Sequence, residues 1–536
     1  MSIDDGLSRR LFLARLSALA AGATGSALLP GVASAATTAP PTLVDVDAPD
    51  GATTDPTSLT VAEAATLIRR GKLTSEELVR ACLERIEGYD SLFQAFNLVL
   101  ADAALARARQ LDGSSPRTAL HGIPLAIKDN YFSRGVRTTA NSFIFADFEP
   151  PYDATALSRL EAAGGVMIGK TQMGPLATTR ATTPAGVITT VNAWAPDHPN
   201  INPGGSSTGS ATATATGMAL SSVGTQTGGS ITAPSNAQGL TGLKPTMGRV
   251  SLHGIIPLTF TRDHPGPIAR DAMDCAIMLT AMAGPDPADF RTLGLPQLPD
   301  LTRAATPVRQ GGQTVLRRRT RIGVTPDFLA SSNPETAAAR RSYLDALAGL
   351  RHATVVEVPL PAEWDLLTGT AFNNVRLPER TEPFREYLRQ DLQLFGVSVL
   401  NWLGGLLLSG DEYLTGQRAK VVMFERVMDE VFDACDVVVQ AQPVPFDIIG
   451  LPEIGFPIGL RAATSDTPVL PIGTILGGQP YAEDRLLEVV AAYQDVTDWH
   501  RRRPELPPAP AASAAPRAPS LAPARLSALE AARIGQ

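Results

Sequence analysis

Short apolar segments alternate with longer amphipathic segments between residues 59 and 503. Apolar runs of a few residues are typical of buried strands, whereas the longer segments have helical spacing. Strands that alternate with helices predict an α/β fold, in which helices cover both faces of a central sheet. The predicted strands are Pro124–Lys128, Val166–Ile168, Met218–Val223, Arg321–Val324, Thr354–Val358 and Val437–Gln440. The predicted helices are Ala101–Leu111, Ala154–Ala163, Gly209–Met218, Glu335–Leu350 and Asp411–Ala434.

Two further helices are predicted before the first of these strands. Thr60 with Glu63, and Thr74 with Glu77, each have the spacing of a capping box. In that arrangement the hydroxyl and the carboxylate each accept a backbone N–H of the first helical turn. Gly71 can end the first of the two helices. The folded domain is therefore predicted to begin close to residue 59.

Composition divides the chain into four parts. Residues 1–35 have the pattern of an export signal, and residues 36–58, rich in Ala, Thr, Pro and Asp, are predicted to be a linker. Residues 59–503 form the predicted folded domain. Residues 504–536 are dominated by Pro and Ala and are predicted to be a solvated low-complexity tail.

The first 35 residues have the order of a twin-arginine export signal. Arg9 and Arg10 stand in the sequence Ser-Arg-Arg-Leu-Phe-Leu, the mildly apolar stretch Leu16–Val32 follows, and Ala33–Ala35 has the small residues that signal peptidase favours. The alternative is a chance basic pair before an alanine-rich helix. Glycine and proline within the stretch argue against a stable membrane span. We predict export by the twin-arginine machinery to the periplasm or the extracellular space.

Charge and composition exclude several classes of partner. The formal net charge is −7 over 536 residues, so no basic field is available to hold nucleic acid or anionic lipid. With 44% hydrophobic and 18% charged residues, the chain has the composition of a soluble globular enzyme. The three cysteines and six histidines have neither the spacing of a zinc site nor that of a disulfide framework. We therefore expect no metal, no cofactor and no nucleic-acid partner.

Two short motifs match well-known patterns but lack the structural context that those patterns require. Gly164–Thr171 fits the phosphate-loop pattern GxxxxGK[ST], yet its middle is predicted to be a strand and the segment before it a helix. Gly205–Gly209 fits the GxSxG nucleophile elbow with Ser207 as nucleophile. The polar, proline-containing segment Asn200–Gly204 in front of it cannot be a central strand. Both motifs are therefore disfavoured.

Two clusters rich in glycine and serine, Gly204–Ser210 and Gly224–Ser230, lie on either side of a small-residue helix and an apolar strand. Linkers are not separated by buried elements. Glycine turns at the ends of such elements are suited to presenting backbone N–H groups and hydroxyls. We interpret residues 202–248 as one site.

This stretch closely resembles the signature of the amidase signature family. Gly122–Asn130 is similar to the family's catalytic-lysine strand, and Gly169–Met173 to the strand end that follows it. The resemblance is good over residues 59–290, weak through 300–450 and partial again over 471–493. It implies a single large domain with a mixed central sheet, and an enzyme that hydrolyses a carboxylic amide to release ammonia or an amine.

Lys128, Ser206 and Ser230 fall on the family's Ser-Ser-Lys positions. The resemblance implies that Ser230 attacks the carbonyl and carries the acyl group. Ser206, which follows a cis peptide bond in the family, would take the proton of Ser230 and pass it to Lys128. Water would then hydrolyse the acyl-enzyme through the same relay. The predicted oxyanion hole consists of the backbone N–H groups of Thr227, Gly228, Gly229 and Ser230.

The relay requires a neutral lysine. A lysine at the end of an apolar strand can lose its charge because burial lowers its pKa. The alternative for Lys128 is a surface residue paired with Asp129. The serine clusters downstream favour the catalytic interpretation.

The chain departs from the family at two positions near the predicted nucleophile. Gln226 stands where the family usually has Asp, and Thr232 where it has Arg, so neutral hydrogen bonds are expected in place of an ion pair. By family position, Tyr131, Phe132 and Met173 are predicted to line the substrate pocket, with core packing as the alternative.

Other functions remain open from the sequence. One is an α/β-hydrolase-type esterase that uses Ser207 with His352 or His500 as its base, and another is a non-catalytic binding protein on the amidase fold. The family also includes the transamidating subunit that makes aminoacyl-tRNA amides. Predicted export and the lack of a basic surface disfavour that role. The expected substrate is a small-molecule or peptide amide.

The apolar run Phe395–Leu408 is too short to span a bilayer. It is predicted to be a buried helix, with an acyl-binding or membrane-touching helix as the alternative.

Overall fold

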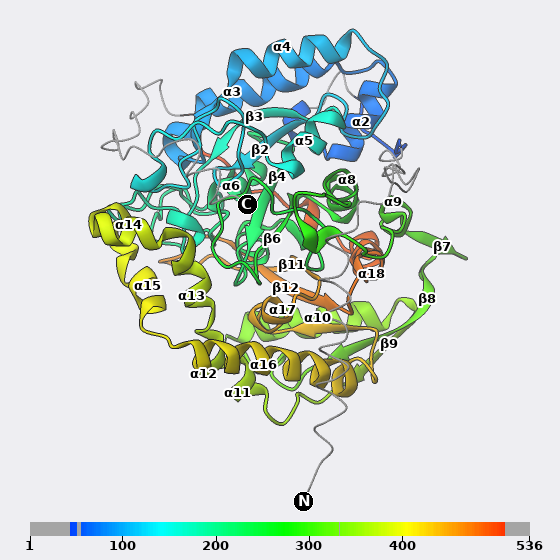
Figure 1. Ribbon diagram of the computed structural model, residues 1–536. Coiled ribbons are helices and arrows are strands. Elements are labelled where there is room, and N and C mark those ends of the chain that lie inside the picture. The colour runs from blue at the N-terminus through cyan, green and yellow to red at the C-terminus, as the bar shows by residue number, and fades with distance from the viewer. Residues whose placement is uncertain (1–42, 51–54, 332, 510–536) are drawn as a thin grey trace, which may run out of the picture. The chain divides into compact units, whose positions relative to one another are not determined.

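The computed structural model describes residues 43–50, 55–331 and 333–509 (Figure 1). The predicted export signal lies outside these residues, as does the predicted tail from residue 510 onward. Part of the predicted linker is described, and it ends in a single 3-10 turn, Pro56–Ser58.

Within the described residues, twelve strands form one mixed sheet in the order β1-β3-β2-β4-β6-β5-β11-β12-β10-β8-β7, and β9 pairs with β8. Neighbours are parallel at β2/β3, β2/β4, β8/β10 and β8/β9 and antiparallel elsewhere. The strands are β1 (Phe96–Val99), β2 (Pro124–Lys128), β3 (Val166–Thr171), β4 (Ser221–Gln226), β5 (Thr241–Lys244), β6 (His264–Ala269), β7 (Val308–Gln310), β8 (Gln313–Val324), β9 (Arg351–Glu357), β10 (Val437–Gln440), β11 (Glu453–Arg461) and β12 (Leu470–Gly478).

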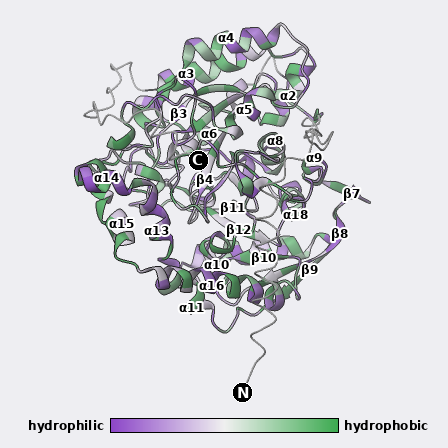
Figure 2. Cartoon of the chain, viewed as in Figure 1, coloured by the Kyte–Doolittle hydropathy of each residue, from purple (hydrophilic) through white to green (hydrophobic). Residues whose placement is uncertain are grey.

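Helices flank this sheet, with α4 beside β3, α3 against α4 and β2, and α10 beside β9 (Figure 1). Both predicted capping boxes are confirmed, at the start of α2 and of α3. The outer helices α3 and α4 carry hydrophilic and hydrophobic residues together (Figure 2). The helices are α2 (Val61–Arg69), α3 (Ser75–Phe93), α4 (Ala101–Asp112), α5 (Thr155–Ala162), α6 (Thr208–Ala215), α7 (Thr232–Gln238), α8 (Ala272–Met282), α9 (Leu301–Ala304), α10 (Pro334–Ala348), α11 (Trp364–Thr368), α12 (Thr370–Asn373), α13 (Arg376–Thr381), α14 (Arg385–Gln390), α15 (Val399–Leu403), α16 (Gly410–Arg426), α17 (Val444–Ile449) and α18 (Glu483–Val496).

The order of β2 and β4 in the sheet positions the site. These strands are parallel neighbours, with Ile127 opposite Val223. The carboxyl ends of parallel strands meet at the same edge of a sheet, where α/β enzymes place their ligands. Lys128 and Gln226 end the two strands and therefore lie at one edge.

Strands β11 and β12 are absent from the prediction because glycine and proline interrupt their apolar pattern. The structure gives a packing reason for one of these glycines. A Cβ added to Gly473 of β12 would collide with the side chain of Asn236 in α7. The small residue therefore lets α7, which follows the predicted nucleophile, pack directly on the sheet.

The prediction that Phe395–Leu408 forms one buried helix is wrong. The run is divided into a 3-10 segment, the short helix α15 and a further 3-10 turn, and Gly396 has a positive φ of 51° within it. Trp402 is fully buried, but Leu400 and Leu407 are 77% and 84% exposed. No single helix in the described part of the chain is long and apolar enough to cross a bilayer. One pair, Leu392–Leu406 and Gly410–Val431, reaches that length and composition only when taken together across a 94° bend.

Candidate active site

Lys128 lies at the end of β2 with no exposed surface. Its Nζ donates to Ser206 Oγ at 2.9 Å, to Thr225 Oγ1 at 2.8 Å and to the Thr225 carbonyl at 3.2 Å. Thr225 also accepts a hydrogen bond from Asn130 Nδ2, 3.1 Å away. Two of the three predicted relay residues are therefore in direct contact inside the protein.

Burial lowers the pKa of Lys128 to about 7. The negative charge of Asp263 raises it, but less than burial lowers it. The alternative partner, Asp129, faces Lys170 instead, with 3.5 Å between Asp129 Oδ1 and Lys170 Nζ. The lysine of β2 is thus neutral in much of the population slightly above neutral pH and can accept a proton.

Ser206 lies in the loop before α6 and follows a cis peptide bond from Gly205. A Cβ added to Gly205 would lie 2.6 Å from the carbonyl oxygen of Thr179, so this position requires glycine. The Ser206 carbonyl accepts the Gly174 N–H at 3.1 Å. The loop that carries Ser206 is therefore held against the segment after β3.

Ser230 lies in the loop between β4 and α7 and is 7% exposed, whereas Ser206 and Lys128 have no exposed surface. The Ser207 N–H donates to the Ser230 carbonyl at 3.4 Å, which joins the two serine-rich loops. Of the three predicted relay residues, only Ser230 has exposed surface, and a backbone hydrogen bond, not a contact between the Ser230 and Ser206 hydroxyls, joins the two loops.

The backbone N–H of Gly229 differs from its predicted role in the oxyanion hole. It donates to Asp447 Oδ2 at 2.8 Å, so the protein itself occupies this donor. Gly229 has a φ of +93°, which glycine adopts without strain. Thr227, Gly228 and Ser230 remain the predicted donors.

Thr225 and Asp263 belong to the site but were missed by sequence reasoning. Asp263 accepts from the Thr227 hydroxyl and from the backbone N–H groups of Leu258 and Thr259, at 2.7 and 3.0 Å. It therefore fixes the start of the predicted oxyanion loop. Asp263 lies between Arg262 and His264, so the sequence offers no signal that separates it from an ordinary polar loop residue.

Tyr131, Phe132 and Met173 are fully buried, which differs from the prediction that they line the substrate pocket. The Tyr131 hydroxyl donates to the Gly224 carbonyl at 2.7 Å. Phe132 packs edge-on against Phe148, with ring centroids 5.1 Å apart. These contacts are consistent with the core-packing alternative, and a role of the three side chains in the substrate pocket stays a prediction.

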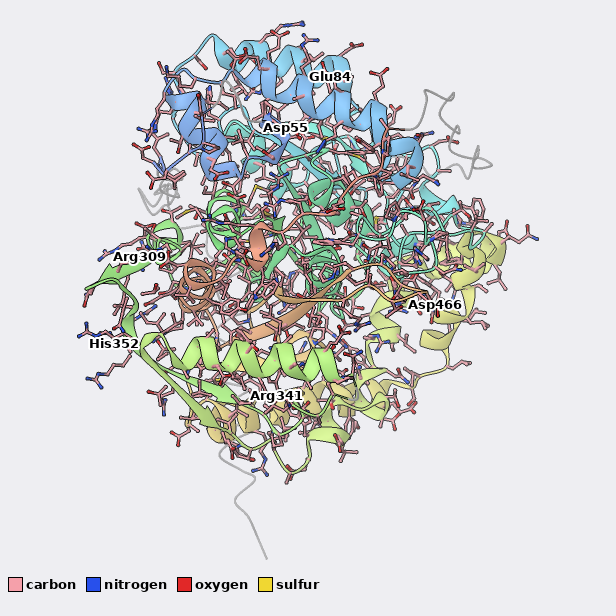
Figure 3. The ribbon with its side chains drawn as sticks, turned by 180° about the vertical axis from the view of Figure 1, so that it is seen from behind. Asp55, Glu84, Arg309, Arg341, His352 and Asp466 are labelled. Carbon is pink, nitrogen blue, oxygen red and sulfur yellow. The ribbon has the colours of Figure 1, made fainter. Side chains whose placement is uncertain are left out.

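The rival nucleophile Ser207 is fully buried, and the described residues directly before it form no strand. Its hydroxyl donates to the Thr225 carbonyl, 3.4 Å away, and a Cβ on Gly224 would collide with it. His352 lies at the periphery of the molecule (Figure 3), where its Nδ1 is 2.9 Å from the Leu316 carbonyl. This geometry does not match a nucleophile elbow, in which the serine is exposed on a sharp turn after a strand.

The residues that match the phosphate-loop pattern, Gly164–Thr171, do not form a phosphate-binding loop. Val166–Thr171 is strand β3, and Gly164 has a positive φ after the end of α5. Lys170 is fully buried and donates to the Thr138 hydroxyl at 2.9 Å and to the Tyr131 carbonyl. A strand with a buried lysine therefore stands where a phosphate site would need an open loop of backbone N–H groups.

Comparison with known proteins agrees with this geometry. The model of the Amidase family matches residues 77–440. The chain belongs to the amidase family. The match extends well beyond residue 290, where the resemblance read from the sequence alone becomes weak.

Individual relatives of this amidase cover most of its length. The A subunit of glutamyl-tRNA(Gln) amidotransferase from Moorella thermoacetica is 34% identical over 498 residues, which cover 84% of this chain and 98% of that protein. The corresponding protein from Chloroflexus aggregans is 36% identical with the same coverage. The solved structure of peptide amidase from Stenotrophomonas maltophilia superposes with a TM-score of 0.68 at 28% identity, covering 83% of this chain and 98% of that one. The predicted α/β fold is confirmed, as is the prediction of a hydrolase that acts on carbon–nitrogen bonds of amides.

Proposed function

We propose that this amidase hydrolyses a carboxylic amide through an acyl-enzyme on Ser230, with Ser206 and Lys128 as its proton relay. The observation that carries the proposal is the 2.9 Å hydrogen bond between Lys128 Nζ and Ser206 Oγ at a fully buried lysine. Burial lowers the pKa of this lysine to about 7, so it can act as a base near neutral pH.

In the proposed reaction, the hydroxyl of Ser230 adds to the substrate carbonyl as its proton moves to Ser206 and the Ser206 proton moves to Lys128. The tetrahedral oxyanion is stabilised by backbone N–H groups of the loop after β4. Collapse of this intermediate breaks the C–N bond, and the relay returns a proton to the departing nitrogen. A water molecule then adds to the acyl-enzyme by the same route and releases the carboxylic acid.

A small-molecule or peptide amide is the proposed substrate class. The structural match to peptide amidase over 98% of that chain supports it. The chain's own residues supply the base, the nucleophile and the oxyanion donors of the proposed mechanism.

A second candidate is a role within an aminoacyl-tRNA amidotransferase. The 36% identity to the Chloroflexus aggregans protein over 98% of its length favours it. The formal net charge of −7 weighs against direct contact with tRNA by this chain. The two candidates differ in whether the isolated chain cleaves simple amides.

We also propose that the protein is exported by the twin-arginine route and works in the periplasm or the extracellular space. The support is the sequence pattern around Arg9, Arg10 and Ala33–Ala35. Export would separate this enzyme from tRNA and so favours the hydrolase over the transamidating role.

The test of function is ammonia release by the purified chain from a panel of primary amides, including C-terminal peptide amides, with Ser230→Ala as the matched control. We expect the wild type to release ammonia without any added partner protein, and we expect no turnover by Ser230→Ala. Wild-type turnover that requires added partner proteins would favour the amidotransferase role. Equal activity of wild type and Ser230→Ala would contradict the proposed nucleophile.

A further inference from the structure

Gln226, the last residue of β4, links two parts of the molecule through its side-chain amide. Its Oε1 accepts the backbone N–H groups of Ile231 and Thr232, both at 2.9 Å. Its Nε2 donates to Asp447 Oδ1 at 3.0 Å and to Glu453 Oε2 at 2.9 Å. One neutral side chain therefore holds the end of the nucleophile loop, defined here as Thr227–Ile231, against two carboxyl groups, one from helix α17 and one from strand β11.

Asp447 holds the same loop from the other side. While Oδ1 accepts from Gln226, Oδ2 accepts the backbone N–H of Gly229 at 2.8 Å. Asp447 lies in α17, and Pro443 at the start of that helix packs over Gly229, where an added Cβ would be 2.8 Å from its Cγ. The residue directly before Ser230 is thus fixed by a buried carboxylate that is remote in sequence.

Asp447 and Glu453 are two buried carboxyl groups whose pKa values are shifted by burial and by neighbouring charges. Burial raises the pKa of Asp447 and raises that of Glu453 well above its usual range, and the negative charge of Asp447 adds to the second shift. Lys244 Nζ lies 3.9 Å from Asp447 Oδ1 and favours its ionised form. Both oxygens of Asp447 accept hydrogen bonds, and the negative charge of Asp447 favours the protonated form of its neighbour Glu453.

We propose that Asp447 is a positioning residue that sets the conformation of the nucleophile loop and thereby the attack geometry of Ser230. This inference rests on the proposed function. It also explains how the chain functions with Gln226 and Thr232 in place of a charged pair. The carboxylate next to the nucleophile loop is that of Asp447 in α17. The neutral amide of Gln226 at the end of β4 donates to this carboxylate and accepts from the end of the loop.

The hydrogen-bond pattern predicts a reciprocal exchange. Asp447→Asn places an NH₂ group against either the Gln226 NH₂ or the Gly229 N–H, so two donors face each other. Gln226→Glu places a carboxylate against Asp447. The double variant restores the pairings at position 447, whereas Glu453, which accepts from Gln226 in the wild type, must be protonated and donate to the new carboxylate. The new carboxylate at position 226 would accept from Ile231 and from the new NH₂ group at position 447, while the amide oxygen at position 447 would accept from Gly229.

The test compares four proteins, namely wild type, both single variants and the double variant. It measures the second-order rate of Ser230 labelling by a fluorophosphonate, kcat and KM on a neutral primary amide, and the melting temperature. We expect each single variant to lose roughly 10²-fold in labelling rate and in kcat with KM little changed, because misplacing a reacting group by about 1 Å has an effect of that size. The double variant should recover to within about tenfold of wild type.

Asp274→Asn is the matched control for loss of a buried carboxylate. Asp274 is fully buried and accepts the N–H groups of Val61 and Ala62 at 2.9 and 3.0 Å, at the start of α2. The control variant should have a lower melting temperature and an unchanged labelling rate in its folded form. Wild-type labelling rates in both single variants, or a double variant that is as slow as the product of the single losses, would overturn the proposal.

Folding and function can be separated in this experiment. If Asp447→Asn does not fold, the test rests on the rate at which Ser230 is labelled in Gln226→Glu. A wild-type labelling rate in that variant overturns the proposal. A wild type that is neither labelled nor active on amides would remove the proposed function and this inference with it. A wild type that is active, with single variants unimpaired, would remove only the inference.

Discussion

Asp129 pairs with Lys170, 3.5 Å away, and not with its neighbour in sequence, Lys128. Successive residues of a strand point to opposite faces, and Lys128 ends β2 immediately before Asp129. Asp129 also accepts from the Thr139 N–H and hydroxyl, at 3.0 and 2.6 Å. The carboxylate is therefore engaged elsewhere, and Lys128 is left without an ion-pair partner among the described residues.

The first prediction concerns the pH dependence of catalysis. Because burial lowers the pKa of Lys128 to about 7, its neutral form is lost as pH falls through that value. We expect kcat/KM of the wild type to decline about tenfold per pH unit well below the pKa and to level off above it. The measurement is a pH–rate profile on a neutral amide.

Lys128→Met tests whether the decline of kcat/KM at low pH, here called the acidic limb, is caused by protonation of this lysine. The variant should lose roughly 10²–10⁴-fold in rate, and its residual rate should lack the limb. Lys72→Ala, at an exposed position, serves as the control and should keep the wild-type profile. An unchanged limb in Lys128→Met would assign the titration to another group.

The second prediction concerns the buried ion pair. Lys170→Met retains most of the side-chain volume but leaves Asp129 buried without its cation. We expect a loss of about 3–5 kcal/mol in the free energy of unfolding, the usual cost of breaking one side of a buried pair. Urea unfolding measures it. Arg389→Met, which breaks an exposed pair with Glu386, should have a much smaller effect, and equal losses would contradict this account.

The third prediction separates this site from a nucleophile elbow. His352→Ala and His500→Ala should retain amide hydrolysis to within about tenfold, since neither acts as the general base. Ser207→Ala should retain the acyl adduct on Ser230. Loss of activity in either histidine variant, with melting temperature unchanged, would restore the esterase alternative.

The fourth prediction concerns export. Exported protein should begin near Ala36, and changing Arg9 and Arg10 together to Lys should abolish export, since lysine keeps the charge but loses the planar fork of donors. N-terminal sequencing of the periplasmic or secreted fraction measures both. Mature protein that still begins at Met1 would contradict the predicted signal.

Local patterns predicted much of the scaffold. The bounds of β2 and β10 agree with the apolar runs that predicted them, and both capping boxes form, because these features depend on residues close together in the chain. The prediction of one helix over Phe395–Leu408 was wrong because Gly396 takes a positive φ, which interrupts the helical backbone. Periodicity carries no information about such a break.

Partners remote in sequence could not be predicted. Asp447 binds Gly229 from 218 residues away, and Asp447 lies where the family resemblance is weak. Thr225 was missed because its contact with Lys128 depends on the register of two parallel strands. A pattern in one segment specifies neither the strand order nor the register that brings these side chains together.

The most direct test of the central claim is mass spectrometry of the protein after reaction with a fluorophosphonate. The proposed mechanism predicts one adduct, on Ser230. This adduct should be absent from Ser230→Ala and form much more slowly in Lys128→Ala and in Ser206→Ala. The Lys128→Ala/Ser206→Ala double variant should be little slower than the more impaired single variant, because either change already breaks the relay. An adduct on Ser207, or losses that multiply across Lys128 and Ser206, would contradict it.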